Sequence, residues 1–267
     1  MQERLPILIS IPHGGTRVPE EVRDNVCIDN QAFAYYSDPA TQRLYDMGDL
    51  AGASMQAEIS RLIIDLNRPP QHLPPRHPDG VVKTKTSFGQ PIWKEEKQPG
   101  LACIRRLLQR YYFPYHAGID RALLTRKVTV ALDCHAMVPV GLPGQPDAGQ
   151  KRTLFCLSNN GDENGHGRPG TLPTCPAEWI QTLADSVRDE FPGAGSVAIN
   201  YPFHGGFIMN AHFWHTGVPW IQIEMNRSLY ESDGSSPGTG SITDESQIVE
   251  LNGILKNILG EWIRNIL

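Results

Sequence analysis

Three side chains able to bind a metal or carry a proton come shortly after apolar, strand-like runs that are far apart in the chain. They are His13, His135 and Glu224. In open α/β sheets, ligands bind beyond the carboxyl ends of the strands, so residues from separate strands can converge there. Imidazole and carboxylate groups are the ligands of catalytic zinc sites. The sequence therefore predicts a hydrolytic metal site at one end of a sheet.

A catalytic zinc ion keeps about three protein ligands and one water molecule. We expect His13 and His135 to be two of these ligands and Asp38 to be the third. Asp38 has a competing interpretation, because Asp ahead of Pro at a helix start is a common N-cap. His204 is the reserve ligand, or else a substrate contact. Asp133 precedes His135 by two residues, so it is expected to share its side of the strand and to hold the second imidazole nitrogen.

Glu224 opens the densest polar cluster, directly after a run too apolar to be exposed. Burial raises the pKa of a carboxyl toward the range of a general base, which is the predicted role. The alternative is a buried ion pair with Arg227. Arg61, Arg68 and Arg227 suggest a substrate with more than one carboxylate, because guanidinium groups bind carboxylates in a bidentate fork. Structural pairing of Asp65 with Arg61 and Arg68 is the competing interpretation.

The elements that must position these residues alternate between β-rich runs and stretches of helical period. The β-rich runs lie at 7–11, 57–66, 128–132, 153–157, 197–199 and 218–223. The helical stretches lie at 101–112, 177–191 and 243–267, the last with Thr243 as N-cap, and loops are expected at 69–100, 138–150 and 161–176. Alternation predicts parallel crossovers. We therefore expect one α/β domain over residues 1–267, with a mostly parallel mixed sheet flanked by helices.

Charge and hydropathy limit the possible partners. The chain of 267 residues has a formal net charge of −5, with 24 Lys and Arg against 29 Asp and Glu. Such a balance disfavours nucleic acid and anionic membrane surfaces. No apolar stretch reaches the roughly 20 residues that cross a bilayer, and the N-terminus lacks a signal-peptide pattern. The sequence therefore favours a cytoplasmic protein with a small-molecule substrate, and it leaves the oligomeric state open.

The cysteines give no sign of a disulfide framework. There are five of them, widely spaced and without a C-x-x-C pair, so reduced thiols are expected. Cys134 lies beside His135 and could be interpreted as a nucleophile. Because neighbouring side chains on a strand point to opposite faces, we expect Cys134 to be a buried, unreactive thiol instead.

Several motifs, taken in order along the chain, resemble the N-formylglutamate amidohydrolase family. They are PHGG at 12–15, SD at 37–38, SRLIIDLNRPP at 60–70, PYH at 114–116, DCH at 133–135, NYPFHGG at 200–206 and QIEMNRSLY at 222–230. The resemblance implies a zinc-carboxypeptidase-like α/β fold. It also implies hydrolysis of N-formyl-L-glutamate to formate and L-glutamate, as in bacterial histidine degradation, with Zn²⁺ or another divalent transition metal.

By matching motifs, the resemblance implies that His13 and His135 are metal ligands and that Glu224 is the catalytic carboxylate. The substrate pocket would be lined by Arg61, Asn67, Arg68 and Arg227. Gly14 and Ala136 stand where the family often has serine. Because these changes touch the pocket lining, related substrates stay open: another N-acyl amino acid, or a small peptide. A non-catalytic protein that binds an acidic ligand is the alternative from a different class.

Overall fold

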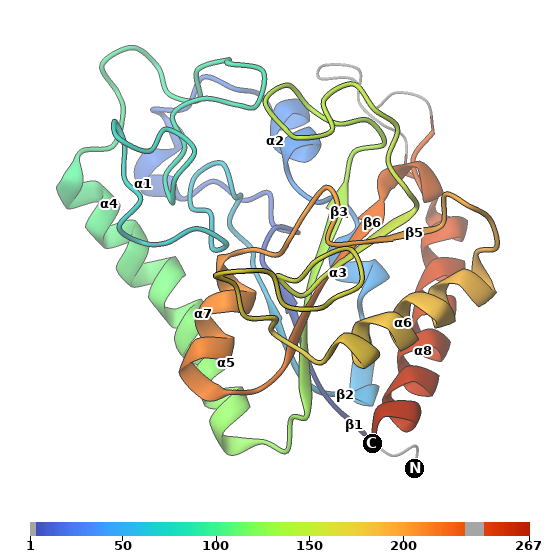
Figure 1. Ribbon diagram of the computed structural model, residues 1–267. Helices are drawn as coiled ribbons and strands as arrows, with labels where there is room; N and C mark the ends of the chain where they lie inside the picture. Colours follow the sequence, from blue (N-terminus) through green and yellow to red (C-terminus); the bar gives the residue numbers. More distant parts are fainter. Residues whose placement is uncertain (1–3, 233–242) are drawn as a thin grey trace.

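One mixed β-sheet forms the centre of the computed structural model, which describes residues 4–232 and 243–267 (Figure 1). Its strands are β1 (Leu5–Ile11), β2 (Ala51–Gln56), β3 (Val130–Met137), β4 (Phe155–Ser158), β5 (Val197–Ile199) and β6 (Trp220–Asn226). Their order is β2-β1-β3-β6-β4-β5. All neighbours are parallel except β4 and β6. The predicted mostly parallel mixed sheet is confirmed.

Helices cover both faces of this sheet. Their bounds are α1 (Glu20–Arg23), α2 (Asn30–Tyr36), α3 (Thr41–Leu44), α4 (Leu101–Leu107), α5 (Phe113–Thr125), α6 (Ala177–Glu190), α7 (Phe207–Thr216) and α8 (Glu245–Ile266). Short helical turns occur at Gly48–Leu50, Leu108–Tyr112 and Arg227–Leu229. In Figure 1, α4, α5 and α7 lie on the left of the sheet and α3, α6 and α8 on the right, each side with its own apolar core.

The central strands are buried on both faces because helices pack against each side. All eight residues of β3 are buried, polar ones included. This pattern is typical of parallel sheets enclosed by helices. The register places Asp133 beside Gln222 and His135 beside Glu224 on the neighbouring strand β6. Polar side chains at the carboxyl ends of β3 and β6 therefore point into one enclosed space.

The predicted strand at 57–66 is wrong. The strand of this region is β2, which ends at Gln56, and the following residues form turns. Ile63 and Ile64 both donate their backbone N–H to the carbonyl of Ser60, and Asp65 donates to the carbonyl of Val81. The apolar side chains of this segment are buried. Its backbone hydrogen bonds, however, are made mostly by turns and by contacts with other loops, not by pairing with a neighbouring strand. The run of apolar residues at 57–66 therefore reflects the burial of these side chains and not a strand.

Two helix predictions need correction at their ends. The helix predicted at 101–112 continues through a π-helical turn, Leu108–Tyr112, into α5. Pro114 stands at the start of α5, directly after this π-helical turn. The N-cap of α8 is Asp244 rather than Thr243, because the Asp244 carboxylate accepts from the backbone N–H groups of Ser246 and Gln247. Thr243 instead forms a bridge with Glu231.

The three predicted loops contain no helix or strand, as expected. Two of them, 69–100 and 138–150, gather near the top of Figure 1, above the sheet. Cys134 is fully buried in the apolar core, which confirms the prediction of a packed thiol. No helix in the described part of the chain is long and apolar enough to cross a membrane.

Candidate metal centre and active site

A pocket of about 660 Å³ opens beyond the carboxyl ends of β1, β3 and β6. Its wall includes all of the residues predicted for the site: His13, Asp38, Arg61, Asn67, Arg68, His135, His204, Glu224 and Arg227. The loops at 69–100 and 138–150 contribute Lys83 and Gln145. The fold thus brings together side chains that lie more than 200 residues apart.

His13 and His135 face each other across this pocket. Their ring centroids are 4.7 Å apart, and both side chains are buried. His135 projects from within β3, whereas His13 follows β1 on a tight segment that ends at Gly15. A Cβ atom on Gly15 would lie 2.3 Å from the backbone carbon of Glu58. Glycine at this position is what lets the His13 segment approach the neighbouring chain.

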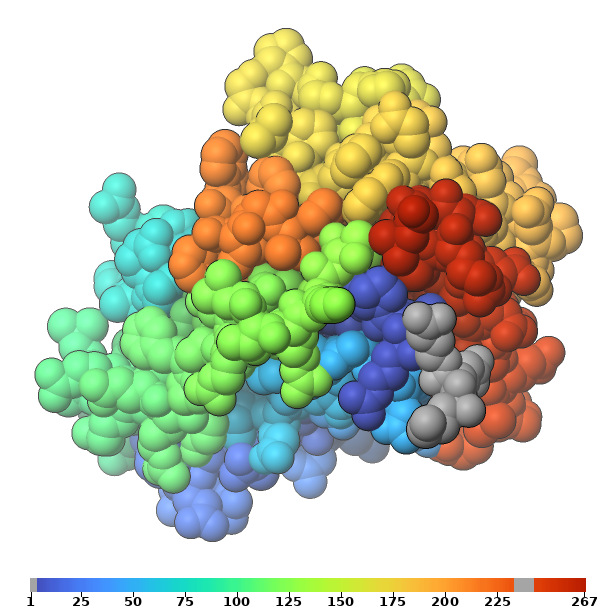
Figure 2. Space-filling view, turned by 90° about the horizontal axis from the view of Figure 1, so that it is seen from below, coloured from blue at the N-terminus to red at the C-terminus, as the bar shows by residue number. Residues whose placement is uncertain are grey.

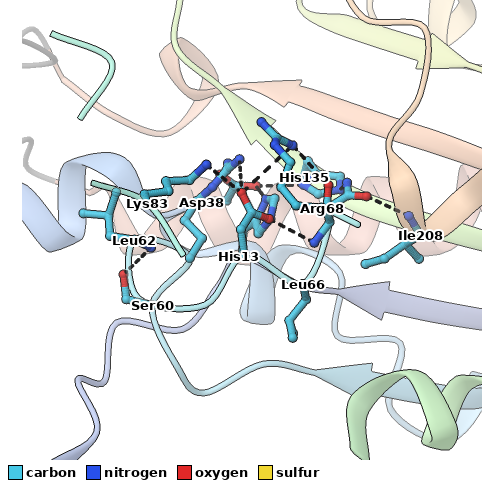
Figure 3. A network of polar contacts seen from close by, with 12 residues as sticks. His13, Asp38, Ser60, Leu62, Leu66, Arg68, Lys83, His135 and Ile208 are labelled. Atoms are coloured by element: carbon cyan, nitrogen blue, oxygen red, sulfur yellow. Dashed lines mark hydrogen bonds and ion pairs between the residues drawn. The ribbon is translucent and has the colours of Figure 1, made fainter. Parts of the chain in front are cut away.

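Asp38 completes a compact group of three possible ligands (Figure 3). Its Oδ2 lies 3.0 Å from Nδ1 of His135 and 3.5 Å from Nδ1 of His13. One ligand atom from each residue falls within 4.8 Å of the others. Asp38 caps no helix, because α3 begins at Thr41 and its N-cap residue is Ala40, which makes no side-chain cap. The N-cap interpretation of Asp38 is therefore wrong.

The outer nitrogen of each imidazole is held by a further carboxylate. His13 Nε2 lies 2.7 Å from Asp65 Oδ1, and His135 Nε2 lies 3.0 Å from Asp133 Oδ2, which confirms the predicted Asp133 contact. Both Nδ1 atoms therefore point inward, and Nδ1 of His13 is buried without a hydrogen-bond partner among the described residues. Carboxylates that orient histidine in this way are typical of metal sites.

The charges around the two imidazoles leave room for a divalent cation. With both imidazoles neutral, as metal ligands are, the contacting cations are Arg61, Arg68 and Lys83. The carboxylates of the cluster are Asp38, Asp65, Asp79, Asp133 and Glu224. With neutral imidazoles, the carboxylates of this cluster outnumber its cations, and a divalent cation would offset the difference. Two imidazoles and one carboxylate are a donor set that suits such an ion.

Glu224 lies beside His135 in the register of β3 and β6. Burial raises the pKa of its carboxyl to about 7. Its Oε1 accepts a hydrogen bond of 2.8 Å from Nε2 of Gln222. The alternative of an ion pair between Glu224 and Arg227 is wrong, because Arg227 donates to Glu231 instead, at 2.8 Å. Glu224 is thus a buried carboxyl without a structural ion pair to Arg227, placed next to the three possible ligands.

Comparison with known proteins decides the family. The family model described as N-formylglutamate amidohydrolase matches residues 5–231, which include every residue of the site. The chain belongs to this family. A curated N-formylglutamate deformylase from Pseudomonas putida is 35% identical over 245 residues, which cover 86% of this chain and 83% of the relative. A second N-formylglutamate deformylase, from Pseudomonas aeruginosa, is 33% identical over 127 residues. The matched part covers 46% of this chain and 47% of that relative.

Solved structures share the fold of this N-formylglutamate amidohydrolase family member. The crystal structure of N-formylglutamate amidohydrolase from Ralstonia eutropha JMP134 has a TM-score of 0.75 at 21% identity, covering 100% of this chain and 96% of that one. A protein from Agrobacterium tumefaciens has a TM-score of 0.67 at 16% identity, covering 98% and 90%. At these identities the likeness establishes the α/β fold and nothing further.

The arginines predicted to bind substrate also make structural contacts. Arg61 lies 3.4 Å from Asp38 and 3.3 Å from Asp65, and Arg68 lies 4.0 Å from Asp65. The pairing considered as the competing interpretation is therefore present. Arg227 is clamped by Glu231 and by a backbone carbonyl, with its guanidinium 5.3 Å from the ring of Tyr35. These contacts hold guanidinium groups rigidly in the wall of the pocket.

The pocket wall also contains polar residues that were not predicted, among them Lys83, Arg152 and Gln222. Lys83 pairs with Asp65 at 3.0 Å, Arg152 pairs with Asp147 at 2.6 Å over the ring of Phe203, and Gln222 donates to Glu224. Lys83 and Arg152 come from segments without periodicity, which gave no signal. The sequence did contain a signal for Gln222. It precedes Glu224 by two residues on a strand, as Asp133 precedes His135, so the two side chains are expected on the same side.

A larger cavity of about 1050 Å³ lies at the opposite end of the sheet. Figure 2 shows this face, where the end of α5, the start of β1 and the end of α8 meet. Its described lining includes Arg126 and Arg264 but no residue predicted for the site. The chemistry of this family member is therefore assigned to the smaller pocket.

Proposed function

We propose that this protein is a metal-dependent amidohydrolase that converts N-formyl-L-glutamate and water to formate and L-glutamate, as in histidine degradation. Family membership and the two deformylase relatives support the reaction. The observation that carries the proposal is the placement of Glu224 beside the group formed by His13, Asp38 and His135.

His13, Asp38 and His135 would hold the metal, with Zn²⁺ as the preferred ion because two imidazoles and one carboxylate are a common catalytic set. When bound, such an ion makes water more acidic and polarises a carbonyl oxygen. Asp65 and Asp133 keep the outer imidazole nitrogens protonated, so that Nδ1 of each ring stays available as a ligand.

Glu224 acts as general base and then as general acid. It takes a proton from the attacking water, whose oxygen forms a bond to the formyl carbon. The carbon–nitrogen bond then breaks, and Glu224 returns the proton to the leaving nitrogen. A pKa of about 7 suits both directions of transfer, because the carboxyl is neither a very weak base nor a very weak acid near neutral pH.

Arginines of the pocket wall would bind the two carboxylates of the substrate. Arg227 is a suitable anchor, because Glu231 and the carbonyl of Tyr35 already fix its guanidinium and little side-chain entropy is lost on binding. Arg61 and Arg68 are partly exposed to the pocket and offer further N–H donors. The formyl group carries only hydrogen on its carbon, so the acyl side needs little space.

A substrate panel tests this function. We expect metal-loaded protein to release formate from N-formyl-L-glutamate with a kcat/KM at least about 100-fold above acetate release from N-acetylglutamate, because a methyl group needs space beside the reacting carbon. N-succinylglutamate and a blocked dipeptide serve as further comparisons. Faster cleavage of any of these three, or no cleavage of N-formyl-L-glutamate, contradicts the proposed substrate.

Asp133→Asn is expected to weaken metal binding by about 10- to 100-fold, because the variant no longer offers His135 a carboxylate. Competition with a chromophoric chelator measures this affinity. Asp185→Asn makes the same change at an exposed position on α6 and should leave metal affinity unaltered. Equal metal affinity in the wild type and Asp133→Asn would remove Asp133 from its supporting role.

A further inference from the structure

The side-chain amide of Gln222 is bonded at one end and unpaired at the other. Nε2 donates to Glu224 Oε1, whereas Oε1 is buried and has no hydrogen-bond partner among the described residues. In its general-base form Glu224 is ionised and can only accept, so in that form the NH₂ end of Gln222 faces Glu224 and the carbonyl faces elsewhere. Buried acceptors are rarely left without a donor, so this carbonyl requires an explanation.

Gln222 and Glu224 lie on the same side of β6, and both line the pocket. Three of the six buried side-chain atoms without a hydrogen-bond partner among the described residues belong to residues of this pocket. Among the described residues that line it, such atoms are Nδ1 of His13, the hydroxyl of Tyr36 and Oε1 of Gln222. The proposed metal accounts for His13. The carbonyl of Gln222 is an acceptor, so a ligand that brings an N–H or O–H donor to this part of the pocket would complete it.

An N-formyl amino acid with ionised carboxylates offers a single donor. Its formyl oxygen and carboxylate oxygens only accept, and the one N–H belongs to the amide bond that is cleaved. We propose that Gln222 Oε1 accepts the N–H of the scissile amide, which makes Gln222 a specificity residue for secondary amides. This inference rests on the proposed function and adds a substrate contact to it.

The contact also places the leaving nitrogen. One amide group of Gln222 joins Glu224 at its NH₂ end and the substrate N–H at its carbonyl end. The nitrogen that receives the proton therefore lies beside the carboxyl that delivers it. Such positioning of a reacting atom next to a proton donor is a recognised source of rate enhancement. A substrate without this N–H would lose the alignment.

A pair of substrates isolates the contact. N-formyl-L-glutamate has the N–H, and its formyl ester analogue, 2-formyloxyglutarate, has oxygen at the same position. We expect the ratio of kcat/KM for amide over ester to fall by about tenfold or more in Gln222→Met, because only the amide loses a hydrogen bond to the carbonyl. The attack step promoted by Glu224 is common to both substrates, and a pH–rate profile for each substrate shows whether a changed pKa of Glu224 contributes to the ratio.

Two further variants complete the test. In Gln222→Glu the new carboxyl shares a proton with Glu224 and keeps a carbonyl oxygen of the same reach, so its amide-to-ester ratio should stay within about threefold of the wild type even if both rates fall. Gln181→Met makes the Gln-to-Met change on α6, away from the pocket, and should leave rates and ratio unaltered. Melting temperature and metal content are measured for each variant, and Gln222→Leu replaces Gln222→Met if the latter does not fold.

Equal losses on amide and ester in Gln222→Met would overturn the proposal, because Gln222 would then act through Glu224 alone. Loss of the amide preference in Gln222→Glu would overturn it as well. Failure of the proposed function gives a different result: the wild-type protein, loaded with metal, would release no formate from N-formyl-L-glutamate.

Discussion

Replacing Glu224 by glutamine is expected to lower kcat for formate release by about 1,000-fold, within the usual range for loss of a general base. Glutamine has nearly the same shape but cannot take the proton of the attacking water. Glu224 is not one of the three possible ligands, so the variant should bind metal with the affinity of the wild type. Steady-state kinetics together with metal analysis of the same sample measure both effects.

The control for this variant is Glu178→Gln, which makes the same change in the first turn of α6. It should retain wild-type kcat and metal content. If Glu224→Gln turns over at a rate near that of the wild type, another group takes the proton, and the assignment of Glu224 is wrong. If it loses its metal, the lowered rate says nothing about proton transfer, and Glu224 belongs to the ligand set instead.

Replacing Asp38 by asparagine is expected to weaken metal binding by more than the roughly 10- to 100-fold typical of an outer-shell partner. Asp38 lies between the two imidazoles, and its carboxylate supplies one of the negative charges that the cation balances. Activity should fall with metal content and return in part at high metal concentration. Isothermal titration of the metal-free proteins gives the affinities.

Asp49→Asn provides the comparison for this effect, because the Asp49 side chain is fully exposed and pairs only loosely with Arg4 at 3.8 Å. Its metal affinity should match that of the wild type. An unchanged affinity in Asp38→Asn would instead assign the Asp38 carboxylate to its contacts with Arg61 and His135, and the third ligand would have to come from elsewhere in the pocket.

The sequence predicted those parts of the site that depend on strand periodicity. His135 and Glu224 follow apolar runs that are strands, and the two-residue period correctly joined Asp133 to His135. The actual strands continue past the apolar runs and include both residues, because buried polar side chains complete β3 and β6. Hydrophobic pattern therefore located β3 and β6 but placed their ends too early.

Strand periodicity could not predict the contacts that irregular segments make. Asp65 was assigned to arginine pairing alone, yet it also holds His13, which is 52 residues away. That contact depends on the turns at 57–66, which bury apolar side chains as a strand would. Gly206 likewise approaches Asn67 so closely that a Cβ atom would lie 2.2 Å from the amide nitrogen. Loop geometry of this kind follows from tertiary packing, not from local periodicity.

Formate release during metal titration tests the central claim most directly. Protein freed of metal by a chelator is supplied with increasing Zn²⁺ and assayed with N-formyl-L-glutamate. We expect no activity without metal, a linear rise up to one equivalent, and a plateau beyond it. Full activity in protein shown to contain no metal would contradict the account.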